Sequence, residues 1–227
     1  MAQVFFPASE IRIGWAGEKL DQLEFFANRA FDDARQALAE ANVDTLQVLL
    51  NVNYVVTAEA RRLISEYALH ARAALDYIIF DLALHNQKRE QDGTQFPIVK
   101  GVKHFPWKLD KSGSRQGTGP LEFLNPDEVT LVERFQPYNG FPLLLVLQRL
   151  SNRDKHRHFV HIGTEHFGSP VPTKNTNTPA STAQVEMQLQ HAFKITLLDA
   201  HDALTSLRVL QTQLTVILRA FNELLDR

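Results

Sequence analysis

The chain has 227 residues, a length that suits one well-buried core, because domains typically hold about 100–150 residues and extend to about 250. Hydrophobic residues (44%), charged residues (22%) and a formal net charge of −2 indicate a globular protein and exclude a global basic field for nucleic acid or membrane. The absence of cysteine excludes a disulfide framework, a thiol nucleophile and a thiolate metal site.

The first half of the chain predicts two helices separated by a strand. Residues 17–41 repeat apolar side chains at three- and four-residue steps, which is typical of an amphipathic helix. Residues 45–56 are rich in β-branched and aromatic residues with partial alternation, which favours a strand. Thr57 can cap a helix that runs to about His85. Because residues 67–84 are apolar nearly all round, we expect this helix to be the central one of a bundle.

The middle of the chain combines an irregular stretch with two further helices. Residues 86–125 contain several glycines and prolines with little periodicity, so we expect an irregular insertion. The sequence NPDE from Asn125 predicts a helix with Pro in its first turn, and this helix ends before Pro137. The next helix is expected from Phe141 to about His158.

The last third predicts an exposed linker and a final helix. Residues 167–183 are rich in Ser, Thr, Asn and Pro, which favours a linker between short strands near 159–164 and 184–190. The spacing of apolar residues over 200–226 predicts an amphipathic helix. The sequence therefore predicts one domain, residues 1–227, of the mainly α (α+β) class: an elaborated four-helix bundle with a small antiparallel β-sheet.

Two helices carry polar residues where their pattern asks for apolar ones. On the central helix, Arg72 and Asp76 lie four residues apart among apolar side chains, so they can form an ion pair. On the helix at 141–158, the apolar stripe of Leu143, Leu147 and Leu150 continues onto Asp154. We therefore expect the polar cluster at 152–158 to face Arg72, Asp76 and one of His70 and Glu66 on the central helix.

This arrangement has two interpretations, and the sequence leaves both open. In the first, the residues form a satisfied ionic network that locks two helices in register. In the second, they form a site with an imidazole that titrates near neutral pH, cations that hold a phosphate, and a carboxylate that orients the imidazole. The second set of groups suits metal-independent phosphodiester chemistry on RNA.

Four short sequences follow one another along the chain: LHARAALDYIIFDLAL at 69–84, QFPI at 95–98, QPY at 136–138 and LSNRDKHR at 150–157. Their succession resembles a large group of uncharacterised bacterial proteins, over roughly residues 57–160. The resemblance implies that His70, Arg72, Asp76 and the Asn-x-Asp-Lys-His-Arg motif are signature positions. It implies no particular activity.

A second resemblance concerns Arg153 and His158. Their Arg-x4-His spacing in a helical bundle is similar to the HEPN superfamily, many of whose members are metal-independent RNases of toxin–antitoxin, CRISPR and phage-defence systems. The resemblance implies that both residues are catalytic, in a composite site across a homodimer. Five residues of helix rotate side chains by about 140°, so both reach one site only near a frayed end or across a dimer. His156, with Lys155 and Arg157, is the stronger candidate because it belongs to the motif of the bacterial group.

Two smaller signals concern ligands. In the loop at 100–119, basic residues alternate with aromatic ones, which suits binding of a single-stranded backbone, although a solvated loop with Trp107 folded onto the core explains the pattern as well. The histidines near the end of the helix at 141–158, with Glu165, raise the possibility of zinc, but their spacing fits no usual site: His156, His158, His161 and His166. We therefore expect no metal and no cofactor.

The sequence thus predicts a cytoplasmic, HEPN-like metal-independent endoribonuclease of a bacterial toxin or phage-defence system. RNA is its expected substrate, a second copy or an antitoxin or defence-complex subunit its expected partner, and no membrane is involved. The alternative is a non-catalytic binding or assembly module. The catalytic candidates are Arg72, Asp76, Asn152, Arg153, Asp154, Lys155, His156, Arg157 and His158. The substrate-binding candidates are Lys103, Trp107, Lys108, Lys111 and Arg115.

Overall fold

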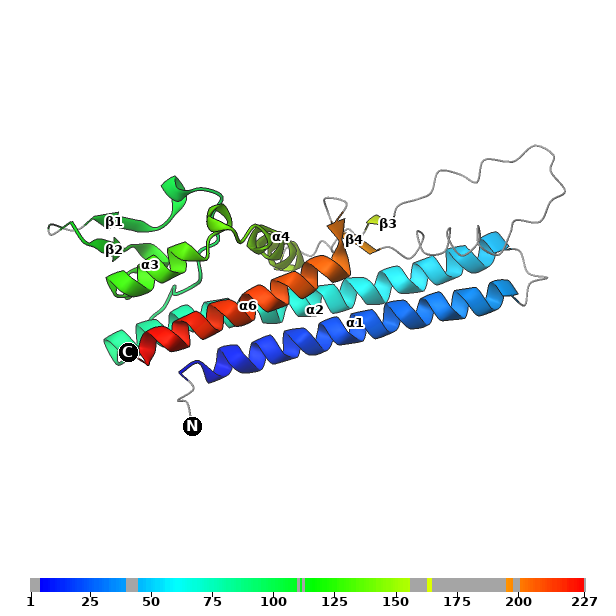
Figure 1. Ribbon diagram of the computed structural model, residues 1–227, viewed down its shortest axis with the longest axis horizontal. Helices are drawn as coiled ribbons and strands as arrows, with labels where there is room; N and C mark the ends of the chain where they lie inside the picture. The colour runs from blue at the N-terminus through cyan, green and yellow to red at the C-terminus, as the bar shows by residue number, and fades with distance from the viewer. Residues whose placement is uncertain are drawn as a thin grey trace. The chain divides into compact units, whose positions relative to one another are not determined.

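Helices make up most of the chain in a computed structural model, which describes residues 5–39, 45–109, 111, 113–155, 163–164, 195–197 and 201–226 (Figure 1). The helices are α1 (Pro7–Ala39), α2 (Thr45–Gln87), α3 (Pro126–Arg134), α4 (Leu143–Lys155) and α6 (Ala203–Leu225). Single 3-10 turns lie at Val102–His104, Gly119–Leu121 and Pro137–Asn139. The strands are β1 (Trp107–Leu109), β2 (Arg115–Gly117), β3 (Gly163–Thr164), β4 (Ile195–Leu197) and β5 (His201–Asp202).

The strands form two small antiparallel sheets, β1-β2 and β3-β4-β5. In the first sheet Trp107 pairs with Gly117 and Leu109 with Arg115. Gly117 is required there, because a Cβ atom at this position would overlap the backbone carbonyl of Leu121. The predicted fold class, a mainly α bundle with a small antiparallel sheet, is confirmed.

The chain divides into two compact units that share α1, α2 and α6. The first unit comprises Met1–Glu18, Ser65–His158 and Arg208–Arg227, and the second comprises Lys19–Ile64 and Phe159–Leu207. The expectation of a single domain stays a prediction. In the second unit, the described core is made by apolar side chains of the three shared helices: Leu20, Leu23, Ala60, Leu63, Ile64, Ala203 and Leu207.

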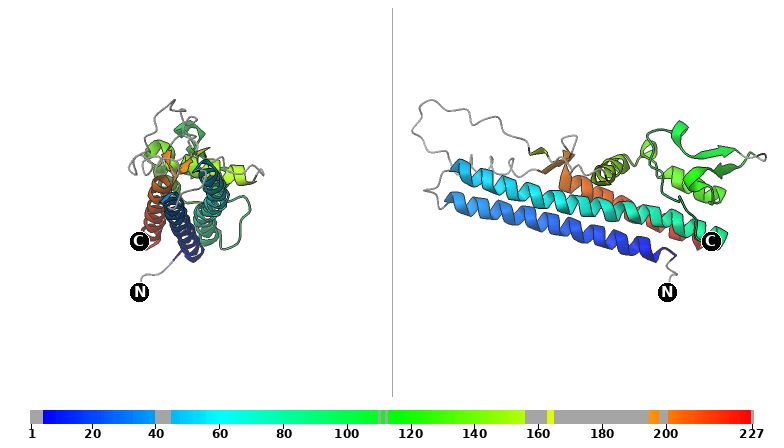
Figure 2. Two further views of the ribbon diagram at one scale, coloured as in Figure 1. Left: turned by 90° about the vertical axis from the view of Figure 1, so that its right-hand side faces the viewer. Right: turned by 180° about the vertical axis from the view of Figure 1, so that it is seen from behind.

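In the first unit, the start of α1 packs antiparallel to the end of α6 (Figures 1 and 2). The ring centroids of Phe6 and Phe221 are 6.3 Å apart, and both side chains are fully buried. Gln211 Nε2 on α6 donates to the Ile13 carbonyl of α1 at 2.8 Å. Gly17 permits this approach, since a Cβ atom there would lie 3.2 Å from Gln211 Nε2.

Helix α3 and α4 were predicted close to their observed bounds. At α3 the side chain of Glu128 accepts a hydrogen bond from the Asn125 backbone N–H at 2.7 Å, which completes a capping box. The Asn86 side chain at the end of α2 donates to the same carboxylate at 2.7 Å. The start of α3 is therefore fastened to the end of α2, within one unit.

The N-terminal half differs from the sequence prediction. Residues 45–56 are the first three turns of α2, so the predicted strand is wrong. Their β-branched content favours strands only weakly, and Leu46, Leu49 and Leu50 also fit a helical step of three and four residues. Helix α1 begins ten residues earlier than predicted, at Pro7, a residue suited to the first helical position.

The remaining predicted elements divide into described and undescribed ones. The final helix is confirmed as α6. The insertion at 86–125 contains the β1-β2 hairpin and two 3-10 turns, which the sequence pattern did not predict. Of the strand expected near 159–164, β3 covers the last two residues, while the linker at 167–183 and the strand at 184–190 lie outside the described residues. In the part of the chain with assigned structure, no helix has the length and hydropathy to cross a membrane.

Candidate functional site

Arg72 and Asp76 form a two-pronged ion pair on α2. Arg72 Nη2 donates to Asp76 Oδ1 at 2.8 Å, and Arg72 Nε donates to Asp76 Oδ2 at 3.1 Å. The Arg72 side chain is 13% exposed and that of Asp76 is 32% exposed. This geometry is the expected i,i+4 pairing, in the bidentate form that gives the strongest arginine–carboxylate contacts.

The same pair binds the backbone of Phe96 in the segment that follows α2. Arg72 Nη2 donates to the Phe96 carbonyl at 2.7 Å, and the Phe96 N–H donates to Asp76 Oδ1 at 2.9 Å. The Phe96 side chain is fully buried, so both of its backbone polar groups need partners inside the protein. The ion pair supplies them, in the way that a neighbouring strand would.

Two glutamines bind the next three residues. Gln136 donates through Nε2 to the Pro97 carbonyl at 2.8 Å and accepts through Oε1 from the Val99 N–H at 3.1 Å. Gln148 Nε2 on α4 donates to the Ile98 carbonyl at 3.0 Å. The Gln136 side chain is fully buried and also donates to the Val132 carbonyl at 3.1 Å.

We call Arg72, Asp76, Gln136 and Gln148 the polar clamp, because together they hold the backbone of segment 96–99. The clamp brings together three of the four signature sequences, those on α2, at QFPI and at QPY. Gln148, which lies two residues before the fourth, was not predicted to take part. The sequence pattern that could have pointed to Gln148 is its polar side chain between the apolar residues Leu147 and Leu150.

His70 contacts a different helix from the polar clamp. Arg12 Nη1 on α1 lies 3.0 Å from His70 Nδ1, and because a guanidinium only donates, Nδ1 accepts this bond. Trp15 packs edge-on against His70 with ring centroids 5.4 Å apart. His70 therefore joins α1 to α2 rather than joining the Phe96 segment.

The helix that carries the predicted cluster has a buried face that can be followed as far as Ser151. Leu147 and Leu150 are fully buried as predicted, and Leu144 replaces Leu143 in the stripe. Asn152 is exposed, one residue after the buried Ser151. Helix α4 ends at Lys155; the side chains of Arg153, Asp154 and Lys155, and all of His156, Arg157 and His158, lie outside the described residues. The predicted contact of this cluster with Arg72 and Asp76 stays a prediction.

The predicted substrate-binding residues lie on and beside the β1-β2 hairpin. Lys103, Lys108 and Lys111 are exposed, and Trp107 is half-buried at the start of β1. Arg115 is the first residue of β2, and its side chain is not among the described ones. Leu109, 60% exposed, adds an apolar side chain to this surface.

Burial changes the titration of two carboxyl groups in the first unit. Burial raises the pKa of Asp81 to about 6, and Asp81 Oδ2 has no hydrogen-bond partner among the residues whose placement is described. Burial also raises the pKa of Glu128, against the opposing effect of hydrogen bonds from the Asn125 backbone and Asn86. Within the described ranges, no group of His, Asp or Glu could hold a metal ion, while the histidines considered for zinc lie outside those ranges.

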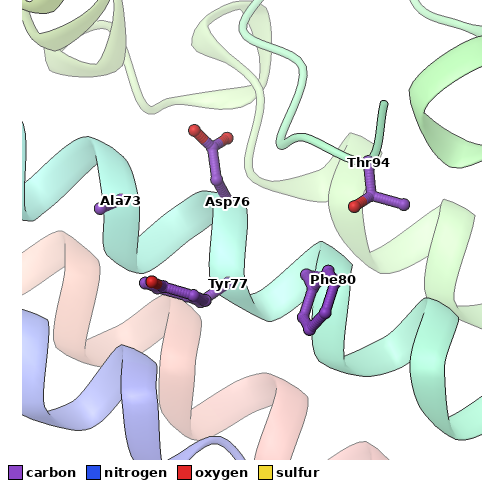
Figure 3. A pocket seen from close by; sticks show the side chains of 5 residues that line it. All are labelled: Ala73, Asp76, Tyr77, Phe80 and Thr94. Atoms are coloured by element: carbon purple, nitrogen blue, oxygen red, sulfur yellow. The ribbon is translucent and has the colours of Figure 1, made fainter. Parts of the chain in front are cut away.

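A surface pocket lies beside the polar clamp and was not predicted. Its lining consists of Ala73, Asp76, Tyr77, Phe80 and Thr94 (Figure 3). Searches among protein-family models, characterised proteins and solved structures find no match for the chain. Function therefore has to be argued from the residues themselves.

Proposed function

We propose that the protein is a metal-independent endoribonuclease, similar to the HEPN superfamily, that acts through the cluster at 152–158. The single observation that supports the proposal is the exposure of Asn152 on α4, directly after the buried Ser151. An exposed polar residue such as Asn152 is accessible to a large substrate such as RNA. The helical bundle agrees with the same proposal, since HEPN-like sites lie on bundle helices.

In the proposed reaction, His156 takes the proton of a ribose 2′-hydroxyl while its oxygen attacks the adjacent phosphorus. The bond from phosphorus to the 5′-oxygen breaks, and that oxygen receives a proton from Lys155 or a protonated histidine. The products carry a 2′,3′-cyclic phosphate and a 5′-hydroxyl. Asp154 orients His156, and the cations Arg153, Arg157 and Lys155 stabilise the charge that develops on the phosphate oxygens.

The proposal gives the remaining candidates supporting roles. Arg72 and Asp76 position the segment 96–99. Gln148 on α4 binds the same segment, so the clamp helps to fix the position of the helix that leads into the cluster. His158 belongs to a composite site in a homodimer. The protein then works in the bacterial cytosol as a toxin or phage-defence nuclease, with an antitoxin or a defence-complex subunit as its partner.

The test is cleavage of end-labelled single-stranded RNA by the purified protein in EDTA. His156→Ala is expected to abolish cleavage with little change in melting temperature, and His158→Ala separates the two histidines. The matched control is His85→Ala, since His85 is exposed on α2 and lies away from the proposed cluster in sequence. No cleavage of any RNA, or full cleavage by the double variant of His156 and His158, would contradict the proposal.

A second function, a non-catalytic binding or assembly module, is favoured by one observation. The four hydrogen bonds given above for the Arg72–Asp76 pair all lie within the fold, as expected for a structural ion network. This function predicts that Arg72→Ala and Asp154→Ala both lower stability strongly while the wild-type protein shows no turnover. The cleavage assay and the melting temperature together distinguish the two functions.

A further inference from the structure

The pocket beside the polar clamp has a volume of about 280 Å³ and belongs entirely to the first unit. Figure 3 shows Ala73, Asp76, Tyr77 and Phe80 along one side of α2, with Thr94 opposite them on the loop that follows the helix. Ligand pockets for drug-sized molecules hold about 300–1,000 Å³. This pocket therefore suits a single ring system rather than a whole nucleotide.

Two aromatic rings give the pocket flat apolar walls. Tyr77 and Phe80 are three residues apart on α2, so their side chains lie on the same side of the helix. The guanidinium carbon of Arg12 lies 5.9 Å from the centroid of the Tyr77 ring, a cation–π contact that restricts the ring from the α1 side. Flat walls of this kind bind planar rings by stacking or edge contacts.

Oxygen atoms supply the polar part of the lining. The Asp76 side chain is 32% exposed, and its carboxylate oxygens are hydrogen-bond acceptors. The Thr94 hydroxyl donates to the Gln91 carbonyl at 3.4 Å, which directs its proton away and leaves its oxygen as an acceptor. A ligand that fits this lining has N–H donors at the edge of its ring.

The net charge at the pocket decides between a cationic and a neutral ligand. Arg72 lies 2.8 Å from the Asp76 carboxylate, so the pair carries little net charge. A full cation would gain little attraction and would meet the Arg72 guanidinium behind the carboxylate. A neutral planar ring that bears amino groups has no such penalty, and carboxylates recognise the amino groups of nucleobases in this way.

We propose that this pocket binds one amino-bearing nucleobase: cytosine, adenine or guanine. The base comes either from a free nucleoside or from an unpaired position of single-stranded RNA. The binding chemistry is the same for both sources. The inference does not depend on cleavage, because base binding can be measured without turnover.

The experiment is ligand-observed NMR titration of the full chain with cytidine, adenosine, guanosine and uridine. Saturable binding of the first three is expected, with uridine weaker because it lacks an exocyclic amino group. Octamers of 2′-O-methyl RNA with the same bases form the second arm, since their blocked 2′-oxygen prevents cleavage. An octamer at least about tenfold tighter than its nucleoside assigns the site to RNA, and equal affinity assigns it to the free nucleoside.

Variants test the location. Ala73→Leu puts a larger side chain into the pocket and is expected to weaken binding about tenfold or more, because the base loses contacts with the lining. Ala58→Leu, at an exposed position on the same helix, is the matched control and should leave binding unchanged. Thr94→Val keeps the shape and removes the acceptor oxygen, so it should reduce the preference over uridine.

Two results would overturn the inference: no saturable binding of any nucleoside or octamer, or binding that Ala73→Leu leaves intact. If Ala73→Leu lowers the melting temperature, the half-exposed Phe80 takes its place as Phe80→Leu, with the same expected loss of binding. An intact ribonuclease activity combined with unchanged binding in these variants would reject the pocket and keep the proposed function. Base binding without cleavage would support the pocket and reject the proposed function.

Discussion

The polar clamp and the end of α4 both carry polar residues beside apolar stripes, yet their surroundings differ. In the clamp, Arg72 and Asp76 bind each other and the backbone of Phe96, and Gln136 binds the backbone of Pro97 and Val99. At the end of α4, Asn152 is exposed directly after the buried Ser151. The clamp's hydrogen bonds stabilise the fold, while the exposed part of Asp76 at the pocket and the exposed Asn152 can each meet a ligand.

The comparison also explains why the clamp consists of long polar side chains. Residues 96–99 belong to no strand and pair with none in the part of the chain that the structure describes, so their backbone groups must be satisfied in another way. Arginine, aspartate and glutamine reach them from α2, from the turn at Gln136 and from α4. The loop between α2 and α3 is thereby fixed at its most apolar residues.

Among the polar substitutions, the largest expected effect is that of Asp76→Ala. The change leaves the Arg72 guanidinium without its ion partner and the Phe96 N–H without an acceptor. Removing one partner of a well-buried pair costs about 3–5 kcal/mol, and the partial exposure of Asp76 reduces this to about 2–4 kcal/mol of unfolding free energy. Urea denaturation followed by circular dichroism measures the loss.

The matched control for this prediction is Glu59→Ala on the same helix. Glu59 also pairs with an arginine, since Arg62 Nη2 donates to it at 2.6 Å, but the two side chains are 35% and 49% exposed. Exposed pairs contribute about 0.2–1 kcal/mol, so the control should lose much less stability than Asp76→Ala. Equal losses for the two variants would mean that the polar clamp has no special role.

A second carboxylate on α2, Asp81, differs from Asp76 because burial disfavours its charged form and no ion pair among the described residues compensates. Asp81 Oδ2 is buried and has no hydrogen-bond partner within the described parts of the chain, and burial raises the pKa of this group to about 6. Because the folded pKa lies above the unfolded value near 3.9, ionised Asp81 destabilises the fold above pH 6. The penalty disappears as the pH falls from about 6 to about 4, where the folded state binds more protons than the unfolded state.

Asp81→Asn should therefore raise the unfolding free energy by about 1 kcal/mol at pH 7, after allowance for partial exposure to solvent. The gain should vanish near pH 4, where wild-type Asp81 is itself neutral. Urea denaturation at several pH values measures the difference between variant and wild type. Asp92→Asn, at an exposed position in the loop after α2, controls for the general loss of negative charge. A gain that is the same at pH 4 and pH 7 would contradict the assigned pKa.

The sequence predicted the helical class because apolar spacing repeats over long stretches of α1, α2 and α6. The strand predicted at residues 45–56 was wrong because a short run of β-branched residues fits both a strand and a helix. Only the continuity of this run with the rest of α2 shows that it is helical. The β1-β2 hairpin could not be predicted from alternation, because each strand has three residues.

For the site, the i,i+4 spacing was enough to predict the Arg72–Asp76 pair but not its contact with Phe96. That contact joins residues 20 and 24 positions apart through a loop, and local periodicity carries no information on such pairs. The pocket was missed for the same reason, because Thr94 approaches α2 only after the loop has turned back. Tyr77 and Phe80 looked like core residues, whereas both are only partly buried.

The smallest expected effect, that of Asn152→Ala, separates the end of α4 from the polar clamp most directly. Asn152 is exposed, so its loss should change the unfolding free energy by less than about 0.5 kcal/mol. Leu150→Ala, two residues earlier and fully buried, should cost about 2–5 kcal/mol in the same urea experiment. If the proposed function is correct and Asn152 is part of its site, RNA cleavage falls in this variant while stability is kept. A stability loss above about 1 kcal/mol for Asn152→Ala would instead place this residue in a structural network, together with Arg72 and Asp76.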